Sequence, residues 1–187
     1  MSETQIRQYA KGKAFHPQTL DRWVRWDEPA REALLRLALG LKLGENHVRD
    51  LMDWLEEIAL RDQTKIDAIL ARKTIADVES NPRLGRTDRL KRIKEEIRRL
   101  RFPRLAQLED SLRVRIHELK LHPEIRISVP PGLEGGRLRV EFAASSSDEL
   151  KLLIAKLADA ASKDALEVIF TILAGQSVEK IGNLFES

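Results

Sequence analysis

The sequence of 187 residues has no cysteine, few histidines and no long apolar run. The lack of cysteine excludes disulfides, thiolate nucleophiles and cysteine-ligated zinc or iron–sulfur clusters. The four histidines include no pair at H-x-x-x-H or H-E-x-x-H spacing, which argues against a metalloenzyme. No stretch approaches the roughly 18 apolar residues of a membrane span, and the N-terminal MSETQIRQYAKGK is too polar for a signal peptide. These absences predict a cytoplasmic protein that does not bind a membrane.

Catalytic motifs are missing as well. No Ser-His-Asp set has a recognisable spacing. The glycine-rich GLEGG (132–136) lacks both the lysine and the strand-to-helix setting of a phosphate loop. We therefore predict a protein that is not an enzyme and that holds no cofactor and no metal.

Charged residues, by contrast, are abundant and unevenly placed. They make up 34% of the chain, against about 25% in an average domain. Residues 83–104 hold ten basic and three acidic side chains, so this segment carries +7 and leaves −4 on the rest of a chain whose total is +3. Such a basic island is typical of a polyanion-binding face. The alternative is a solvated helix whose arginines pair with Glu95, Glu96 and acidic neighbours.

Apolar residues recur at helical spacing over most of the chain. Pro17 and Pro29 suit the first turns of helices. NPRLG (81–85) indicates a break, and Pro103 should end or kink the helix before it. The expected helices span 3–10, 17–26, 29–39, 45–61, 64–79, 88–102 and 104–120.

After Pro123 the apolar period changes from helical to alternating. EIRISV and GRLRVEF alternate apolar and polar residues around PPGLEGG, which predicts an antiparallel hairpin with one apolar face. A helix from Asp148 should cover that face, and a last helix should span 164–174. The residues predicted to support dimerisation are Ile125, Ile127, Val129, Leu138, Val140, Phe142, Leu150, Leu153, Ile154 and Leu157. A second copy can pair with the hairpin edge, unless helix 164–174 folds over it.

The predicted fold class is mainly α with a small α+β C-terminal unit. Residues 1–82 are expected to form a helical domain that contains a helix-turn-helix, and residues 83–103 a basic linker helix. Residues 104–187 should form an α-β-β-α dimerisation unit with an extra C-terminal helix.

The helix-turn-helix is predicted from the layout IRQYA–KGKAF–HPQTLDRWVRW. On the second helix, Leu20, Trp23 and Val24 can pack inward. Glutamine and arginine suit base edges, whereas threonine and lysine suit phosphates. The candidate DNA contacts here are Lys11, Lys13, Gln18, Thr19, Arg22 and Arg25.

The stretch from Lys11 to Leu51 resembles the central region of ParB-type chromosome- and plasmid-partitioning proteins. In that family a helix-turn-helix precedes residues of the type L-P-x-x-V-R-x-L-L and K-L-S-x-G-H-A-R-x-L. Here the chain reads TLDRWVRWDEPAREALLRLAL and KLGENHVRDLM, with His47 and Arg49 at the family's His and Arg. GGRLRVEF and SSSDELKLLIAKL are similar to the family's C-terminal dimerisation element. The family's N-terminal nucleotide-binding domain has no counterpart in this sequence.

The resemblance implies a homodimer that binds double-stranded DNA in partitioning or transcriptional regulation, with a ParA-type ATPase as a possible further partner and a location on the nucleoid. Without the nucleotide-binding domain, no CTP switch is expected. His47 and Arg49 would then contact phosphates beside the reading helix. The basic segment would add phosphate contacts through Arg86, Arg89, Arg92 and Arg99.

A second hypothesis is a helical adaptor that binds another protein rather than DNA. It rests on the acidic balance outside residues 83–104 and on the missing nucleotide domain. In this interpretation Glu56, Glu57 and Asp62 form part of a recognition surface, and the basic helix meets an acidic partner.

Overall fold

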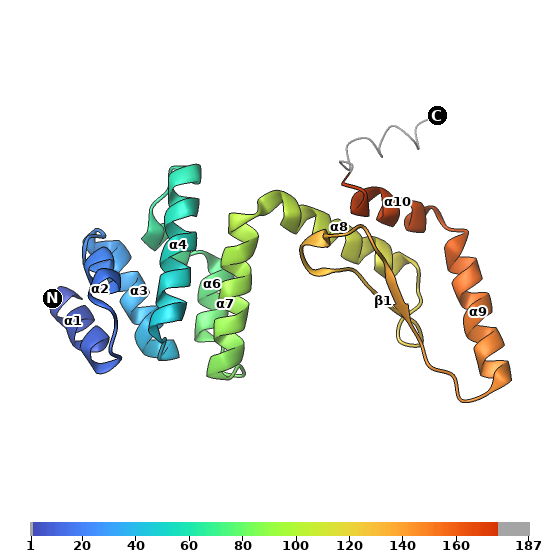
Figure 1. Cartoon of the computed structure of the whole chain (residues 1–187), viewed down its shortest axis with the longest axis horizontal. Helices are drawn as coiled ribbons and strands as arrows, with labels where there is room; N and C mark the ends of the chain where they lie inside the picture. Colours follow the sequence, from blue (N-terminus) through green and yellow to red (C-terminus); the bar gives the residue numbers. More distant parts are fainter. Residues whose placement is uncertain (1, 176–187) are drawn as a thin grey trace. The chain divides into compact units, whose positions relative to one another are not determined.

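The computed structural model describes residues 2–175 of the chain, which fall into two units. Unit 1 comprises residues 1–102 and unit 2 comprises residues 103–187. Figure 1 labels the helices and strands of both. The structure is mainly helical with one small antiparallel sheet, as predicted.

Unit 1 contains helices only within its described residues. Their starts follow local signals: the His16 side chain caps one helix by accepting from Gln18 N, and Asp27 caps the next by accepting from Ala30 N. The helices are α1 (Ser2–Gly12), α2 (Pro17–Val24), α3 (Glu28–Leu41), α4 (Glu45–Asp62), α5 (Ile66–Leu70), α6 (Lys73–Ser80) and α7 (Arg86–Arg101).

The single helix predicted over 64–79 is instead two helices, α5 and α6, separated at Ala71 and Arg72. Ile69, Leu70 and Ile75 are all buried in the core of unit 1. On one continuous helix these three side chains would point in three different directions, because successive residues are rotated by roughly 100°. The break lets all three reach the core.

Helix α7 belongs to unit 1 and is not a separate linker. Ile93 and Ile97 on this helix are completely buried, and they join a core formed with residues of the six preceding helices. The helix predicted over 83–103 as a connection is therefore a core element, because its apolar stripe is buried within this unit.

Unit 2 consists of α8 (Pro103–Glu118), β1 (Arg126–Ser128), a 3-10 turn (Pro131–Leu133), β2 (Arg139–Glu141), α9 (Ser147–Ala161) and α10 (Asp164–Leu173). The two strands pair antiparallel with Ile127 opposite Val140. The turn between them is close to α10, since a Cβ on Gly136 would lie 3.4 Å from the carbonyl oxygen of Leu173. Residues 176–187 of the predicted C-terminal unit lie outside the described residues.

The core of unit 2 takes four buried residues from α10, two from α9, three from residues 119–125 and one from α8, and α8 and α10 pack against each other. The partly buried hairpin residues, including Ile127 and Val140, contact this core. Helix α9 contributes Leu153 and Ala160 but does not lie over the hairpin as predicted, and Figure 1 shows it standing apart from the strands. Leu157 is partly buried against the same core, whereas Leu150, Leu152 and Ile154 of this helix are exposed.

No helix among residues 2–175 combines the length and the hydropathy needed to pass through a bilayer.

Candidate nucleic-acid interface

Helix α2, the predicted reading helix, is held within unit 1 by an aromatic cluster of the buried Trp23 and the partly buried Tyr9 and Phe15. The Tyr9 ring makes edge contacts with Phe15 and Trp23, at centroid distances of 5.9 and 6.4 Å. The Tyr9 hydroxyl lies 2.9 Å from the carbonyl oxygen of Ala38 and 2.7 Å from that of Leu43. Burial raises the pKa of this hydroxyl. These contacts fix α1 and α2 on α3.

The inner face of α2 agrees with the prediction. Trp23 is completely buried, and Leu20 and Val24 are partly buried against the same core. Gln18 and Arg25 are exposed on the outer side. The helix therefore has the amphipathic division that a reading helix needs.

Thr19 departs from the prediction. Its side chain is buried, and its hydroxyl donates to Glu45 Oε1 at 2.5 Å. Glu45 also accepts from the backbone N–H of His16 at 3.1 Å. The hydrogen bond from Thr19 is the main cause that holds the pKa of Glu45 below its usual range. Thr19 thus ties α2 to the start of α4 and is not a free phosphate contact.

Arg22 is fixed by acidic residues of α4. Its Nη1 lies 2.6 Å from Asp53 Oδ1, and its Nε and Nη2 donate to Glu56 at 3.1 and 2.7 Å. Trp26 Nε1 donates to the same Glu56 at 2.7 Å. The hydrogen bonds with Glu56 are the main cause that raises the pKa of Arg22. Asp53 and Glu56 are three residues apart, so they lie on one face of α4, and this spacing was the sequence signal that both could pair with one cation.

The two segments that resemble the ParB family meet at one hollow in unit 1. Its volume is about 540 Å³. The lining residues come from the start of α2 and the start of α4: His16, Gln18, Thr19, Arg22, Glu45 and Arg49. The hollow thus brings together predicted contacts that lie about thirty residues apart in the sequence.

The other predicted contacts of this region are outside the hollow. Lys11, Lys13, Arg25 and His47 are all exposed. Lys13 Nζ lies 3.5 Å from the carbonyl oxygen of Lys42, which places the lysine beside the end of α3. These exposed groups can reach a polyanion without breaking an ion pair that holds the fold.

No family model, curated protein or solved structure matches this chain. The resemblance to ParB proteins rests on the motifs alone.

Much of the basic segment is balanced inside unit 1. Lys94 lies 2.7 Å from Asp50, and its ammonium is 4.9 Å from the ring centroid of Trp54. Arg101 lies 2.6 Å from Glu57. These two pairs connect α7 to α4, so part of the local positive charge serves the fold.

The four arginines predicted to contact phosphates in this segment lie in different surroundings. Arg89 donates to the carbonyl oxygens of Leu84 (3.1 Å) and Glu79 (3.2 Å), so it supports the turn before α7. Arg86 and Arg92 are exposed, and Arg99 is partly buried. Arg86 and Arg92 are thus the members of the set with the most accessible guanidinium groups.

The C-terminal end of α7 is capped by Arg61, which was not among the predicted functional residues. Arg61 donates to the carbonyl oxygens of Leu100 (2.7 Å) and Arg101 (2.6 Å) while it pairs with Asp62 at 2.7 Å. Free carbonyls at a helix C-terminus attract cations. This contact secures the last turn of unit 1.

The residues predicted to form the dimer divide by exposure. Ile125 and Leu153 are buried in the core of unit 2. The partly buried members are Ile127, Val129, Leu138, Val140 and Leu157. Phe142, Leu150 and Ile154 remain 38, 40 and 51% exposed. These last three are available to a partner.

Residues 2–175 contain no group of three or more histidine, aspartate or glutamate side chains that could hold a metal ion.

Proposed function

We propose that this chain is a non-enzymatic, ParB-like DNA-binding protein, in which α2 reads duplex DNA and unit 2 joins two copies. The observation that carries the proposal is the meeting of α2 and the start of α4 at the hollow that Gln18, Arg22 and Arg49 line. These are side chains of the types that recognise base edges and phosphates. They come from the two segments that resemble the family.

In this proposal Arg22 reads a base from a fixed position. Asp53 and Glu56 together accept one hydrogen bond from each of the three guanidinium nitrogens of Arg22. Two of the five N–H donors of the guanidinium therefore remain for DNA. Holding the guanidinium in place reduces the entropy lost on binding. The two carboxylates also offset its charge, so affinity for phosphates has to come from other residues.

The phosphate contacts are assigned to exposed cations. Four exposed residues precede or follow the reading helix in the sequence: Lys11, Lys13, His47 and Arg49. On α7 the proposal retains the exposed Arg86 and Arg92. It omits the partly buried Arg99 and also Arg89, whose guanidinium donates to two carbonyl oxygens. Each phosphate neutralised should add about 0.9 to the salt slope of binding.

The homodimer is assigned to unit 2. Phe142, Leu150 and Ile154 are large apolar side chains left in solvent. A second copy that covers them would remove apolar area from water, at about 25 cal/mol per Å². Two reading helices in one dimer would raise affinity through effective concentration. A ParA-type ATPase is the further partner that the family resemblance implies.

The test is a titration of labelled duplex DNA at two salt concentrations. Binding should be measurable at about 50 mM salt and should fall steeply by 200 mM. Arg25→Gln should weaken it, because Arg25 is an exposed cation on the outer side of α2. Arg36→Gln is the matched control on α3, since the Arg36 side chain is 63% exposed. Absence of binding at the lower salt would remove the proposal.

A second candidate function is the helical adaptor. The observation in its favour is that Arg22, Lys94 and Arg101 are paired with acidic residues of α4, which reduces the positive charge available to DNA. This candidate would be favoured if the chain does not bind DNA at low salt but retains a specific protein in a pull-down.

A further inference from the structure

Unit 2 contains a second hollow, with a volume of about 430 Å³, that the proposed function does not use. Five of its lining residues are basic, four are aliphatic and none is acidic: Arg113, His117, Lys120, His122 and Arg126, with Ile116, Leu121, Ile125 and Ile127. Small-molecule sites commonly measure about 300–1,000 Å³. The size and the one-sided charge both indicate a ligand site.

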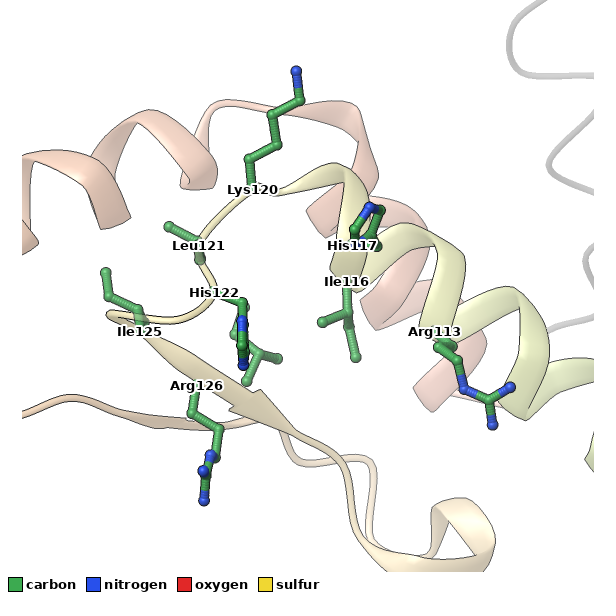
Figure 2. Close-up of a pocket in the computed structure, with 9 residues that line it drawn as sticks. Arg113, Ile116, His117, Lys120, Leu121, His122, Ile125 and Arg126 are labelled. Atoms are coloured by element: carbon green, nitrogen blue, oxygen red, sulfur yellow. The ribbon is translucent and has the colours of Figure 1, made fainter. Parts of the chain in front are cut away.

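The lining side chains come from three consecutive segments. Helix α8 supplies Arg113 and Ile116, the segment after it supplies His122, and β1 supplies Arg126. Figure 2 shows Ile116 and His122 pointing into the space between α8 and β1, with Arg113 and Arg126 on either side. Lys120 points away from this space in the same view. In this view both arginine side chains extend outward from the two ends of the space, so they lie at its rim.

The nearby carboxylates already have partners, and one of these partners is a cation of the hollow. Asp110 accepts from Arg113 at 3.0 Å, and the Arg113 side chain is still 74% exposed. Glu124 pairs with Lys156 at 2.7 Å, and that hydrogen bond is the main cause that lowers the pKa of Glu124. Within residues 2–175 no ion pair joins Arg126 to a carboxylate. An uncompensated cation at the rim attracts an anion.

The base of the hollow is apolar and firm. Ile125 is 1% and Leu121 4% exposed, and both belong to the core of unit 2. Ile116 and Ile127 are partly buried against that core. A bare phosphate, or the phosphate backbone of DNA, would use the cations and leave this aliphatic base in contact with water.

We propose that this hollow binds a small organic anion with an aliphatic body. The carboxylate or phosphate head group lies at the rim, within reach of Arg113 or Arg126, and the aliphatic part lies on Ile116 and Ile127. Arginine suits this role because its planar group of N–H donors matches both head groups. The inference does not depend on DNA binding, because the site lies wholly within unit 2.

The test is isothermal titration calorimetry on the full chain with octanoate, octyl phosphate, inorganic phosphate and octylammonium. Both octyl anions should bind more tightly than inorganic phosphate, and octylammonium should not bind. The tighter of the two anions identifies the head group as carboxylate or phosphate. Equal binding of octylammonium, or equal binding of inorganic phosphate, would overturn the proposal.

Variants locate the site. Arg126→Gln should raise the Kd of the octyl anions by about tenfold, the loss expected for one charge-assisted hydrogen bond. Arg139→Gln is the matched control on the paired strand, since Arg139 lies outside the hollow and its side chain is 75% exposed. Arg113→Gln should act like Arg126→Gln, with Arg115→Gln as its control on α8. Equal losses in a variant and its control would overturn the assignment.

Ile116→Ala tests the apolar base. It should weaken octyl phosphate and leave the weak response to inorganic phosphate unchanged, because only the octyl chain contacts the isoleucine. If the octyl anions do not bind and duplex DNA broadens the amide NMR signals of residues 113–127, the hollow is a nucleic-acid contact and the proposal fails.

Discussion

In unit 1, nineteen buried residues, eighteen of them from the seven helices, form one core among the described residues, whereas the described core of unit 2 contains ten. Large apolar side chains left in solvent show the opposite trend. Unit 1 exposes Leu39, Leu60 and Phe102, while unit 2 exposes Val114, Phe142, Leu150, Leu152, Ile154 and Phe170. Unit 1 therefore covers most of its large apolar side chains itself, and unit 2 leaves more of them in solvent.

The largest effect is expected from truncation of the better-covered core. Leu55 on α4 is completely buried, so Leu55→Ala should lower the free energy of unfolding of unit 1 by about 2–5 kcal/mol. Urea denaturation followed by far-ultraviolet circular dichroism measures this change. Leu60→Ala is the control, since Leu60 is 84% exposed and its loss should cost less than about 0.5 kcal/mol.

The next prediction concerns self-association, which is proposed for unit 2 and not for unit 1. Ile154→Asp should convert the proposed dimer to a monomer, because burial of an unpaired carboxylate in an apolar interface is unfavourable. Sedimentation equilibrium on the full chain measures the mass. Leu60→Asp places the same charge on an exposed position of unit 1 and should leave the mass unchanged. A wild-type monomer at tens of micromolar would show that unit 2 is complete without a second copy.

Alanine at two glycines should change stability in opposite directions. Gly40→Ala should stabilise unit 1 by about 0.5–1 kcal/mol, because Gly40 is helical and nothing lies within 4 Å of an added Cβ. Gly136→Ala should destabilise unit 2 by about 1–3 kcal/mol, since Gly136 has φ +60 and an added Cβ would lie 3.4 Å from Leu173 O. Denaturant midpoints measure both. A neutral Gly136→Ala would show that the turn moves freely away from α10.

The smallest effect is a pH dependence that both units share. Hydrogen bonds from Thr19 to Glu45 and from Ser145 to Glu149 lower the pKa of each carboxyl group in the folded chain. Their contribution to stability is therefore complete above the carboxyl pKa of the unfolded chain and is lost as the pH falls through the lower folded value. Thr19→Val and Ser145→Ala should each flatten the acid limb of the stability curve. An unchanged acid limb in both variants would contradict this assignment.

The elements of the fold could be predicted largely because their signals are local. Pro17 begins α2 where the sequence places a helix start, and α4 spans 45–62 against a predicted 45–61. The hairpin follows from alternation within EIRISV and GRLRVEF. Caps, prolines and apolar periods act over a few residues, so the order of neighbours along the chain contains the needed information.

The candidate interface could be predicted only in part, because its contacts are made over long separations. The exposed positions of Gln18 and Arg25 follow from the helical period of α2. The partners of Arg22 do not, since Asp53 and Glu56 lie more than thirty residues away and only the packing of α2 on α4 brings them close. The same holds for Lys94 and Asp50, which explains why the net charge of residues 83–104 overstated the free positive surface.

The placement of Tyr9 against Trp23 also has an optical consequence. The chain has one tyrosine and three tryptophans, and all four lie in unit 1 at Tyr9, Trp23, Trp26 and Trp54. The ring centroids of Tyr9 and Trp23 are 6.4 Å apart, so the excitation energy of Tyr9 is transferred to Trp23 while α1 and α2 stay packed. Recovery of tyrosine emission would therefore report the separation of these two helices.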